Sequence, residues 1–294
     1  MRFNSPKIKT SKVITIFLVW LIVIGYLLFV IIPYGWLFIT SLKESSEVIR
    51  LPLEFLPDKL YLKNYFEVLA INNLNNSKAL SINISSAFIN TLIVAFISTF
   101  IALLIGLPAS YSFAKYKFWG RKSLLITTLT TRMFPVIALA IPIFQIILKI
   151  GLYDNKIGLI LVYTSLTLPF TIWVMYSYFR DVPTELEDAA KIDGCNFFKM
   201  FIHVILPISK PGIIATFILT LIYPWNELLL NSILSASKKS QTLAYALVQY
   251  NTGQQIYWGH LSAAVIATSL PVVILTLLLQ RYVIQGLTLG AVKE

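Results

Sequence analysis

Residues 187–194 read Glu-Asp-Ala-Ala-Lys-Ile-Asp-Gly, and residues 204–207 read Val-Ile-Leu-Pro after a gap of nine residues. This polar segment lies between long apolar runs. Its pattern is that of a helix, a glycine and a second helix. A membrane protein has little reason to keep so organised a loop unless another protein docks there. Residues 180–211, called the polar loop below, are therefore the first candidate for a functional site.

Local chemistry predicts that the polar loop begins with a short helix. Thr184 and Glu187 have the spacing of a capping box. Glu185, Glu187 and Asp188 occupy the first turn, where the helix dipole favours anions. Gly194 suits the left-handed position just after the helix. The predicted helix has about nine residues and is roughly 13 Å long, enough to fill a groove on a partner.

A second helix is predicted to begin after Asn196, whose side chain can cap it, to run to Leu206 and to end at Pro207. Ala189 and Ala190 leave one face of the first helix small, so another surface can approach closely. Local physics alone gives equal weight to two interpretations. One is a docking element for a partner protein, and the other is an amphipathic helix at the membrane surface with no partner.

The composition is that of a membrane protein. Of the 294 residues, 57% are hydrophobic and only 13% are charged, and the mean hydropathy is +0.77. A soluble domain of this length cannot cover its surface with so few charges. The net charge of +11 comes from cations scattered at the flanks of apolar runs, so we expect contact with anionic lipid and no nucleic-acid partner.

Two kinds of site are excluded by simple counts. The single cysteine, Cys195, excludes an internal disulfide and a cysteine-based metal cluster, and we predict no metal site. No Gly-x-x-x-x-Gly-Lys-Ser/Thr motif occurs, so the chain carries no P-loop for ATP. The spans hold no cluster of histidine and carboxylate residues, which argues against an intramembrane enzyme.

Six apolar runs are long enough to cross about 30 Å of hydrocarbon. They lie at residues 13–40, 87–114, 124–150, 157–179, 213–234 and 261–285. The predicted fold is an all-α integral membrane protein with six transmembrane helices. Each run contains proline, which frees a backbone carbonyl and permits a kink, and six kinked spans suit a curved bundle around a cavity.

The charges between the runs predict the orientation. Lys115, Lys117, Arg121 and Lys122 follow the second run without an acid, which places that connection in the cytoplasm. The first run is much too long for a signal peptide and lacks a small-x-small cleavage site, so we expect it to be retained. The predicted organisation is a cytoplasmic tail at 1–12, a first helix at 13–40, an extracytoplasmic loop at 41–86, a membrane core at 87–285 that includes the polar loop, and a cytoplasmic tail at 286–294.

The polar loop resembles the EAA motif of ABC importers, the cytoplasmic loop by which permease subunits contact their ATPases. The family pattern is Glu-Ala-Ala, three residues, Gly, nine residues and Ile-x-Leu-Pro. Here Asp188 stands for Glu and Val204 for Ile, with the spacing intact. Segments at 88–92, 107–114, 118–121, 132–135 and 225–227 are similar, in order, to segments of carbohydrate-uptake permeases. The ending at 280–293 is similar to that of the maltose-type permease subunit. Glu294, where the family often has Gly, and the polar tract 72–85 depart from the pattern.

The resemblance implies the type I ABC importer permease fold with a cytoplasmic coupling helix. It implies a permease subunit of an ATP-driven, binding-protein-dependent importer for a sugar or small oligosaccharide, in a prokaryotic cell membrane, working by alternating access. The implied partners are a second, homologous permease subunit, two ATPase subunits that bind ATP and Mg, an extracytoplasmic solute-binding protein, the sugar and membrane lipid. This chain itself is expected to bind no cofactor and to be no enzyme. The alternative is a permease for another small solute such as glycerol 3-phosphate.

The resemblance also assigns roles to particular residues. Asp188 would anchor the coupling helix in an ATPase groove, and Gly194 would set the angle of the turn. The residues expected to couple the chain to the ATPases are Glu187, Asp188, Ala189, Ala190, Asp193, Gly194, Leu206 and Pro207. The tail residues expected to contact the ATPases are Gly290, Ala291, Val292 and Lys293.

Three polar residues within the predicted spans are candidate cavity or substrate contacts. Arg132 costs about 2.5–3.5 kcal/mol at the centre of a bilayer, so we expect it either to face the bundle and pair with a carbonyl or a partner group, or to reach the inner headgroups. Asn226 and Glu227 lie beside Trp225, and carboxylate plus aromatic is the chemistry of sugar binding. An interhelical hydrogen bond is the alternative role for Glu227. In importers that the chain resembles, the main sugar pocket lies in the other permease subunit.

Overall fold

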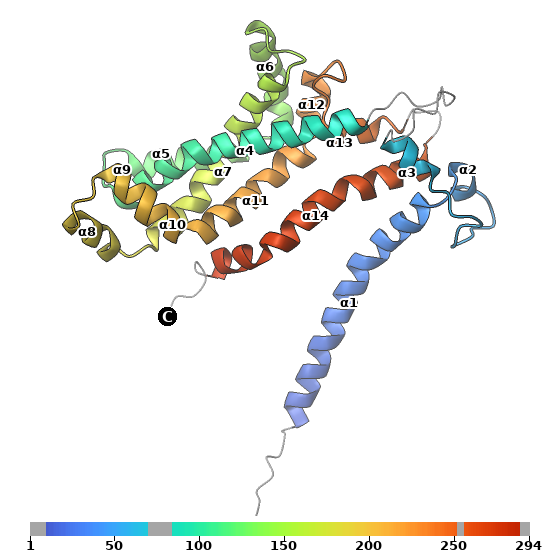
Figure 1. Cartoon of the computed structure of the whole chain (residues 1–294), viewed down its shortest axis with the longest axis horizontal. Coiled ribbons are helices and arrows are strands. Elements are labelled where there is room, and N and C mark those ends of the chain that lie inside the picture. The colour runs from blue at the N-terminus through green and yellow to red at the C-terminus, as the bar shows by residue number, and fades with distance from the viewer. Residues whose placement is uncertain (1–9, 70–83, 252–255, 289–294) are drawn as a thin grey trace, which may run out of the picture. The chain divides into compact units, whose positions relative to one another are not determined.

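The computed structural model describes residues 10–69, 84–251 and 256–288. Within these ranges the regular secondary structure is helical, apart from isolated bridge residues (Figure 1). The chain divides into two compact units. Unit 1 comprises Met1–Asn72 and Thr252–Ala267, and unit 2 comprises Asn73–Asn251 and Thr268–Glu294. The all-α membrane fold expected from the apolar runs is confirmed.

Four of the described helices are long and apolar enough to cross a membrane. They are α1 (Thr10–Ser41), α4 (Ile84–Lys115), α7 (Lys156–Arg180) and α14 (Trp258–Thr288). Two bent pairs bring the number of candidate spans to six if each pair counts as one. The first pair joins Arg121–Met133 to α6 (Val136–Lys149) at 97°, and the second joins Phe197–Ile208 to α11 (Lys210–Asn226) at 76°.

The predicted third span, 124–150, is not one continuous helix. It consists of α5 (Arg121–Thr130), the 3₁₀ turn η1 (Thr131–Met133) and α6. The helix stops at Phe134, which is extended (φ −69°, ψ 128°), because the ring of Pro135 disfavours the helical conformation in the residue before it. The proline therefore breaks this span instead of only kinking it.

The predicted fifth span, 213–234, also differs from the structure. Helix α11 ends at Asn226, and Glu227 is extended (φ −74°, ψ 119°). The Glu227 carboxylate then accepts hydrogen bonds from the backbone N–H groups of Leu230 (2.9 Å) and Asn231 (3.2 Å). These bonds provide acceptors for N–H groups in the first turn of a separate helix, α12 (Leu229–Leu234). The chain therefore changes direction at Glu227.

The core of unit 2 is built on α4 and α7, which pack along one another, with α11 against both. Gly106 of α4 permits this close approach, because a Cβ there would lie 2.8 Å from the Thr171 Cγ2 of α7. One apolar cluster surrounds Tyr163, Leu159 and Leu230. A second surrounds Tyr111, Phe179 and Ile205, next to the polar loop. A short helix, α13 (Leu243–Val248), packs on α4.

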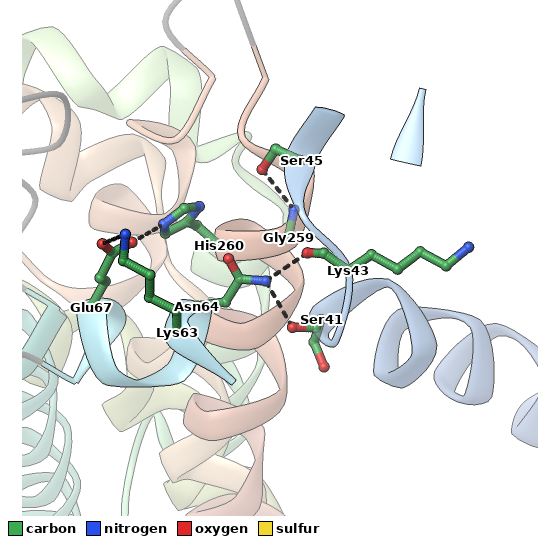
Figure 2. Close-up of polar contacts among 8 residues, drawn as sticks. All are labelled: Ser41, Lys43, Ser45, Lys63, Asn64, Glu67, Gly259 and His260. Carbon is green, nitrogen blue, oxygen red and sulfur yellow. Dashed lines mark hydrogen bonds and ion pairs between the residues drawn. The ribbon is translucent and has the colours of Figure 1, made fainter. Parts of the chain in front are cut away.

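Unit 1 is held together by polar contacts at the end of α1 and the start of α14 (Figure 2). It also contains α2 (Ser45–Val48) and α3 (Lys63–Val68). The Asn64 amide of α3 donates to the carbonyls of Ser41 (2.9 Å) and Lys43 (2.7 Å). His260 Nε2 of α14 lies 2.6 Å from the Glu67 carboxylate of α3. Helix α3 therefore joins the first and last long helices within this unit.

Candidate functional site

The polar loop forms a compact lobe at one end of unit 2. Figure 1 shows α8, α9 and α10 together at the end of the unit where α4 finishes. Helix α8 is Glu185–Ile192, α9 is Phe197–Met200, the π-helical turn η2 is Phe201–Ile205 and α10 is Leu206–Ile208. The predicted pattern of two helices separated by a glycine is confirmed.

The first turn of α8 does not form the predicted capping box. Thr184 is itself helical (φ −70°, ψ −24°), and its side chain makes no capping hydrogen bond. The carboxylate of Glu187, which was expected to reach back toward Thr184, instead faces Lys115 at the end of α4. The capping prediction is wrong because Thr184 is already helical and the Glu187 carboxylate pairs with Lys115.

Lys115 and Glu187 form a buried ion pair between α4 and α8. Lys115 Nζ lies 3.0 Å from Glu187 Oε1, and the two side chains are only 9% and 10% exposed. Glu187 Oε1 has no well-aligned hydrogen bond, so the attraction is chiefly Coulombic. Lys115 Nζ also donates to the carbonyl of Val182 (2.6 Å). These contacts attach the start of the polar loop to the end of a membrane helix.

In the sequence, Lys115 is only one of the four cations that predict a cytoplasmic connection. The residue gave no further signal because its partner belongs to a distant segment of the chain. Glu187 is correspondingly directed into the protein. Its direct contact with an ATPase remains a prediction, whereas its contact with Lys115 is part of the structure.

The glycine turn after α8 has the predicted geometry. Gly194 has φ +77°, in the left-handed region, and its N–H donates to the Lys191 carbonyl (3.0 Å). A Cβ at Gly194 would meet no atom within 4 Å, so only the backbone conformation requires glycine there. The Asn196 side chain accepts from the N–H of Lys199 (2.9 Å), which confirms the predicted cap of the second helix.

The second helix of the loop differs from the prediction at its end. Pro207 does not terminate it, because α10 continues to Ile208 and the chain bends at Ser209 before α11. Pro207 has no N–H to donate to the carbonyl four residues earlier, and the wider π turn η2 occupies the residues just before it. Phe201 and Ile205 of η2 are buried, while Phe198 and Ile202 are exposed.

The outer surface of the lobe combines acidic and apolar side chains. Asp188 and Ala189 are exposed, Ala190 is buried, and Ile192 is 86% exposed. Asp188 Oδ1 accepts from Lys191 Nζ (2.9 Å), and this hydrogen bond raises the pKa of Lys191. Asp193 is exposed as well. The open face of α8 therefore combines small, acidic and apolar side chains.

The other candidate residues lie away from this lobe. Glu227 is 9% exposed and accepts from the Tyr163 hydroxyl (2.8 Å) in addition to two backbone N–H groups, which is the interhelical role. The Asn226 amide donates to the Ile222 carbonyl of its own helix (2.9 Å). Arg132 Nη1 donates to the Leu166 carbonyl of α7 (3.0 Å). The structure thus brings together the residues of the polar loop but does not bring these three residues to it.

Gly290, Ala291, Val292 and Lys293 lie outside the described residues, as does most of the polar tract 72–85. In the described part of the chain, Glu47, Glu54 and Asp58 are the carboxylates close enough to share a cation, with oxygens within 4.8 Å. They are partly or fully exposed, and such acidic groups are common without an ion.

Comparison with known proteins gives one family over most of the chain. The family described as the binding-protein-dependent transport system inner membrane component matches residues 102–289. The trehalose transport system permease protein of Mycobacterium tuberculosis is 35% identical over 92% of this chain and 94% of its own length. The trehalose/maltose transport system permease protein of Thermococcus litoralis is 31% identical over 93% and 96%. A bacterial ABC transporter involved in the import of the acidic polysaccharide alginate has the same fold (TM-score 0.78, 21% identity, 95% of this chain and 99% of that chain).

Proposed function

Because this chain belongs to the family of binding-protein-dependent transport system inner membrane components, we propose that it carries a sugar or small oligosaccharide across the cell membrane. The chain is a membrane permease subunit of an ABC importer and is a transporter, not an enzyme. Relatives aligned over nearly the whole chain are named for trehalose and maltose transport, and this supports the sugar as the substrate class. They do not favour glycerol 3-phosphate.

The polar loop is the proposed contact with the ATPases. One observation carries this assignment: α8 is fixed to α4 by the buried Lys115–Glu187 pair, while its opposite side, with Asp188 and Ile192, is open. Such a helix can transmit a displacement to the membrane core because it cannot move independently of α4. In this proposal the ATPases bind ATP and Mg²⁺, close on one another and pull α8, and the movement switches the cavity from one side of the membrane to the other.

The proposed assembly contains a second, homologous permease subunit, two ATPase subunits and an extracytoplasmic binding protein. The polar loop and both chain ends face the cytoplasm in this arrangement. The tail residues 290–293 are proposed to contact the ATPases as well. In this proposal, transport requires no cofactor bound to this chain.

Purification from the native membrane tests the assembly. We expect mass spectrometry of the purified complex to identify a second permease and a P-loop ATPase. Reconstituted with its binding protein in vesicles, the complex should take up trehalose or maltose when ATP is supplied on the side of the polar loop. Recovery of this chain without any ATPase, even after cross-linking, would contradict the proposal.

Cross-linking tests the contact itself. In a Cys195→Ser background, which has no other cysteine, Asp188→Cys should cross-link to the ATPase through a short bifunctional maleimide. Ser46→Cys, an exposed position in unit 1 on the predicted opposite side of the membrane, is the matched control and should not. Equal cross-linking of both variants would remove the support for the polar loop as the docking element.

A further inference from the structure

A cavity of about 280 Å³ lies in unit 2 where the third predicted span is broken. Its walls include Arg132, Phe134, Val136, Ser165, Pro169 and Tyr223, which come from η1, the extended residues after it, α6, α7 and α11. The volume is just below the usual range for ligand sites, about 300–1,000 Å³, so the cavity suits a small ligand of roughly one sugar ring. The walls combine aromatic and apolar surface with a few polar groups, as ligand sites do.

Some backbone groups around this cavity lack their usual partners within a helix. Phe134 and Pro135 are extended, so the first N–H groups of α6, at Val136 and Ile137, have no helical acceptor. On the α7 wall, Pro169 has no N–H, and the Ser165 carbonyl therefore loses its helical donor. Within a membrane such irregular backbone is tolerated only where protein buries it or where it lines a polar cavity.

Arg132 is held in place by its surroundings. Its Nη1 donates to the Leu166 carbonyl (3.0 Å), and its guanidinium lies 5.4 Å from the ring centre of Phe170 and 5.7 Å from that of Tyr223. Contact with two aromatic rings stabilises the charge and fixes the plane of the group. The remaining guanidinium N–H groups are then oriented in advance of binding.

The charge of Arg132 has no acidic partner among the described ion pairs of the chain. Glu227, the buried carboxylate of the α11–α12 turn, is already engaged by Tyr163, Leu230 and Asn231. Arg132 is exposed in this chain, and a charged residue within a membrane span is costly and usually marks a functional site. Donors fixed in a cavity of this size suit a ligand that is rich in oxygen atoms.

We propose that this cavity binds one ring of the transported sugar, with Arg132 donating hydrogen bonds to the sugar oxygens and the rings of Phe134 and Tyr223 covering its apolar face. The inference rests on the proposed function and adds a solute contact within this subunit. Arg132 would then favour passage of the sugar by replacing hydrogen bonds that the sugar makes to water.

The first test measures protection of the cavity in the complete importer. Ser165→Cys in the Cys195→Ser background places the sole cysteine on the cavity wall. We expect trehalose or maltose, whichever the wild-type complex takes up, to slow its reaction with a methanethiosulfonate reagent. An unrelated sugar that is not taken up should leave the rate unchanged.

The second test measures uptake. Arg132→Gln should raise the KM for the transported sugar about tenfold or more, because hydrogen bonds from a charged group are lost. Arg121→Gln is the matched control: its guanidinium lies 6.0 Å from the ring centre of Tyr176 and does not line the cavity. The Ser165→Cys measurement keeps Arg132 and so remains informative if Arg132→Gln fails to assemble.

The outcomes separate the two proposals. Uptake of sugar with no protection at Ser165→Cys and an unchanged KM in Arg132→Gln would overturn the cavity assignment and leave the proposed function standing. Uptake of no sugar or small oligosaccharide, trehalose and maltose included, would overturn the proposed substrate class and this inference with it. Protection together with a raised KM only in Arg132→Gln would support both.

Discussion

At the scale of single residues, Gly194 determines the direction of the chain between the two helices of the polar loop. Its left-handed φ costs a residue with a Cβ about 1–2 kcal/mol, and more when that residue is β-branched. We expect Gly194→Val to assemble with its partners but to lower uptake at least tenfold, measured as sugar transport into vesicles. Gly194→Asn, which tolerates this conformation, is the control and should keep most of the activity. Wild-type uptake by Gly194→Val would show that the turn angle is unimportant.

Also at this scale, the Lys115–Glu187 pair should stabilise the protein measurably. Glu187→Gln keeps the shape but leaves a buried ammonium without its counter-charge, and breaking such a pair costs about 3–5 kcal/mol. We expect a clear drop in the thermal unfolding temperature of the purified complex. Asp188→Asn alters the neighbouring exposed pair with Lys191 and should leave the unfolding temperature nearly unchanged. The double variant Glu187→Gln, Lys115→Met should regain part of the loss, and equal stability of all variants would contradict a structural role for the pair.

At the scale of elements, Asp154 joins the turn between α6 and α7 to the segment after α12. It accepts from the hydroxyls of Ser237 (2.6 Å) and Ser240 (2.5 Å) and from the N–H groups of Ala236 and Ser237 (both 3.0 Å). Burial raises the pKa of Asp154, but the hydrogen bonds from Ser237 and Ser240 and from the backbone outweigh it, so the pKa lies below its usual range. The folded state therefore stabilises the ionised form of Asp154.

The sign of this shift predicts a pH dependence. The stabilisation is fully present above the ordinary pKa of aspartate, about 4, and is lost as the pH falls through the lowered folded-state pKa. We expect Asp154→Asn to lower the unfolding temperature at pH 7 and the difference from the wild type to shrink near pH 3. Thermal unfolding of both proteins between pH 3 and pH 7 measures this difference in unfolding temperature. A difference that grows on acidification would contradict the assignment.

At the scale of the whole molecule, the distribution of charge predicts that both chain ends lie in the cytoplasm. Lys117, Arg121 and Lys122 remain exposed or half-buried, as cations near anionic headgroups should. In the Cys195→Ser background, Ser5→Cys should react with a membrane-impermeant maleimide only after the cells are opened. Ser46→Cys should react in intact cells. The reverse pattern would invert the topology and place the polar loop outside, where no ATPase could reach it.

The sequence by itself determined the features that depend on neighbouring residues. Long apolar runs specify membrane helices because the bilayer offers no partner to an open backbone. Gly194 and Asn196 specify the end of one helix and the start of the next because their effects are local. The spacing of the motif residues in the polar loop is also a local property of the sequence, and it indicated the family.

Only the tertiary structure decided which distant groups meet. Glu187 had the spacing of a capping box, but a lysine from another helix offered a stronger interaction for a buried charge. Glu227 ends one helix and caps the next because its carboxylate is fixed by Tyr163 from α7. Arg132 faces a cavity because Pro135 breaks its span and because α7 and α11 supply a carbonyl and an aromatic ring. Each outcome depends on a free-energy difference between competing partners, and those partners come together only when the chain has folded.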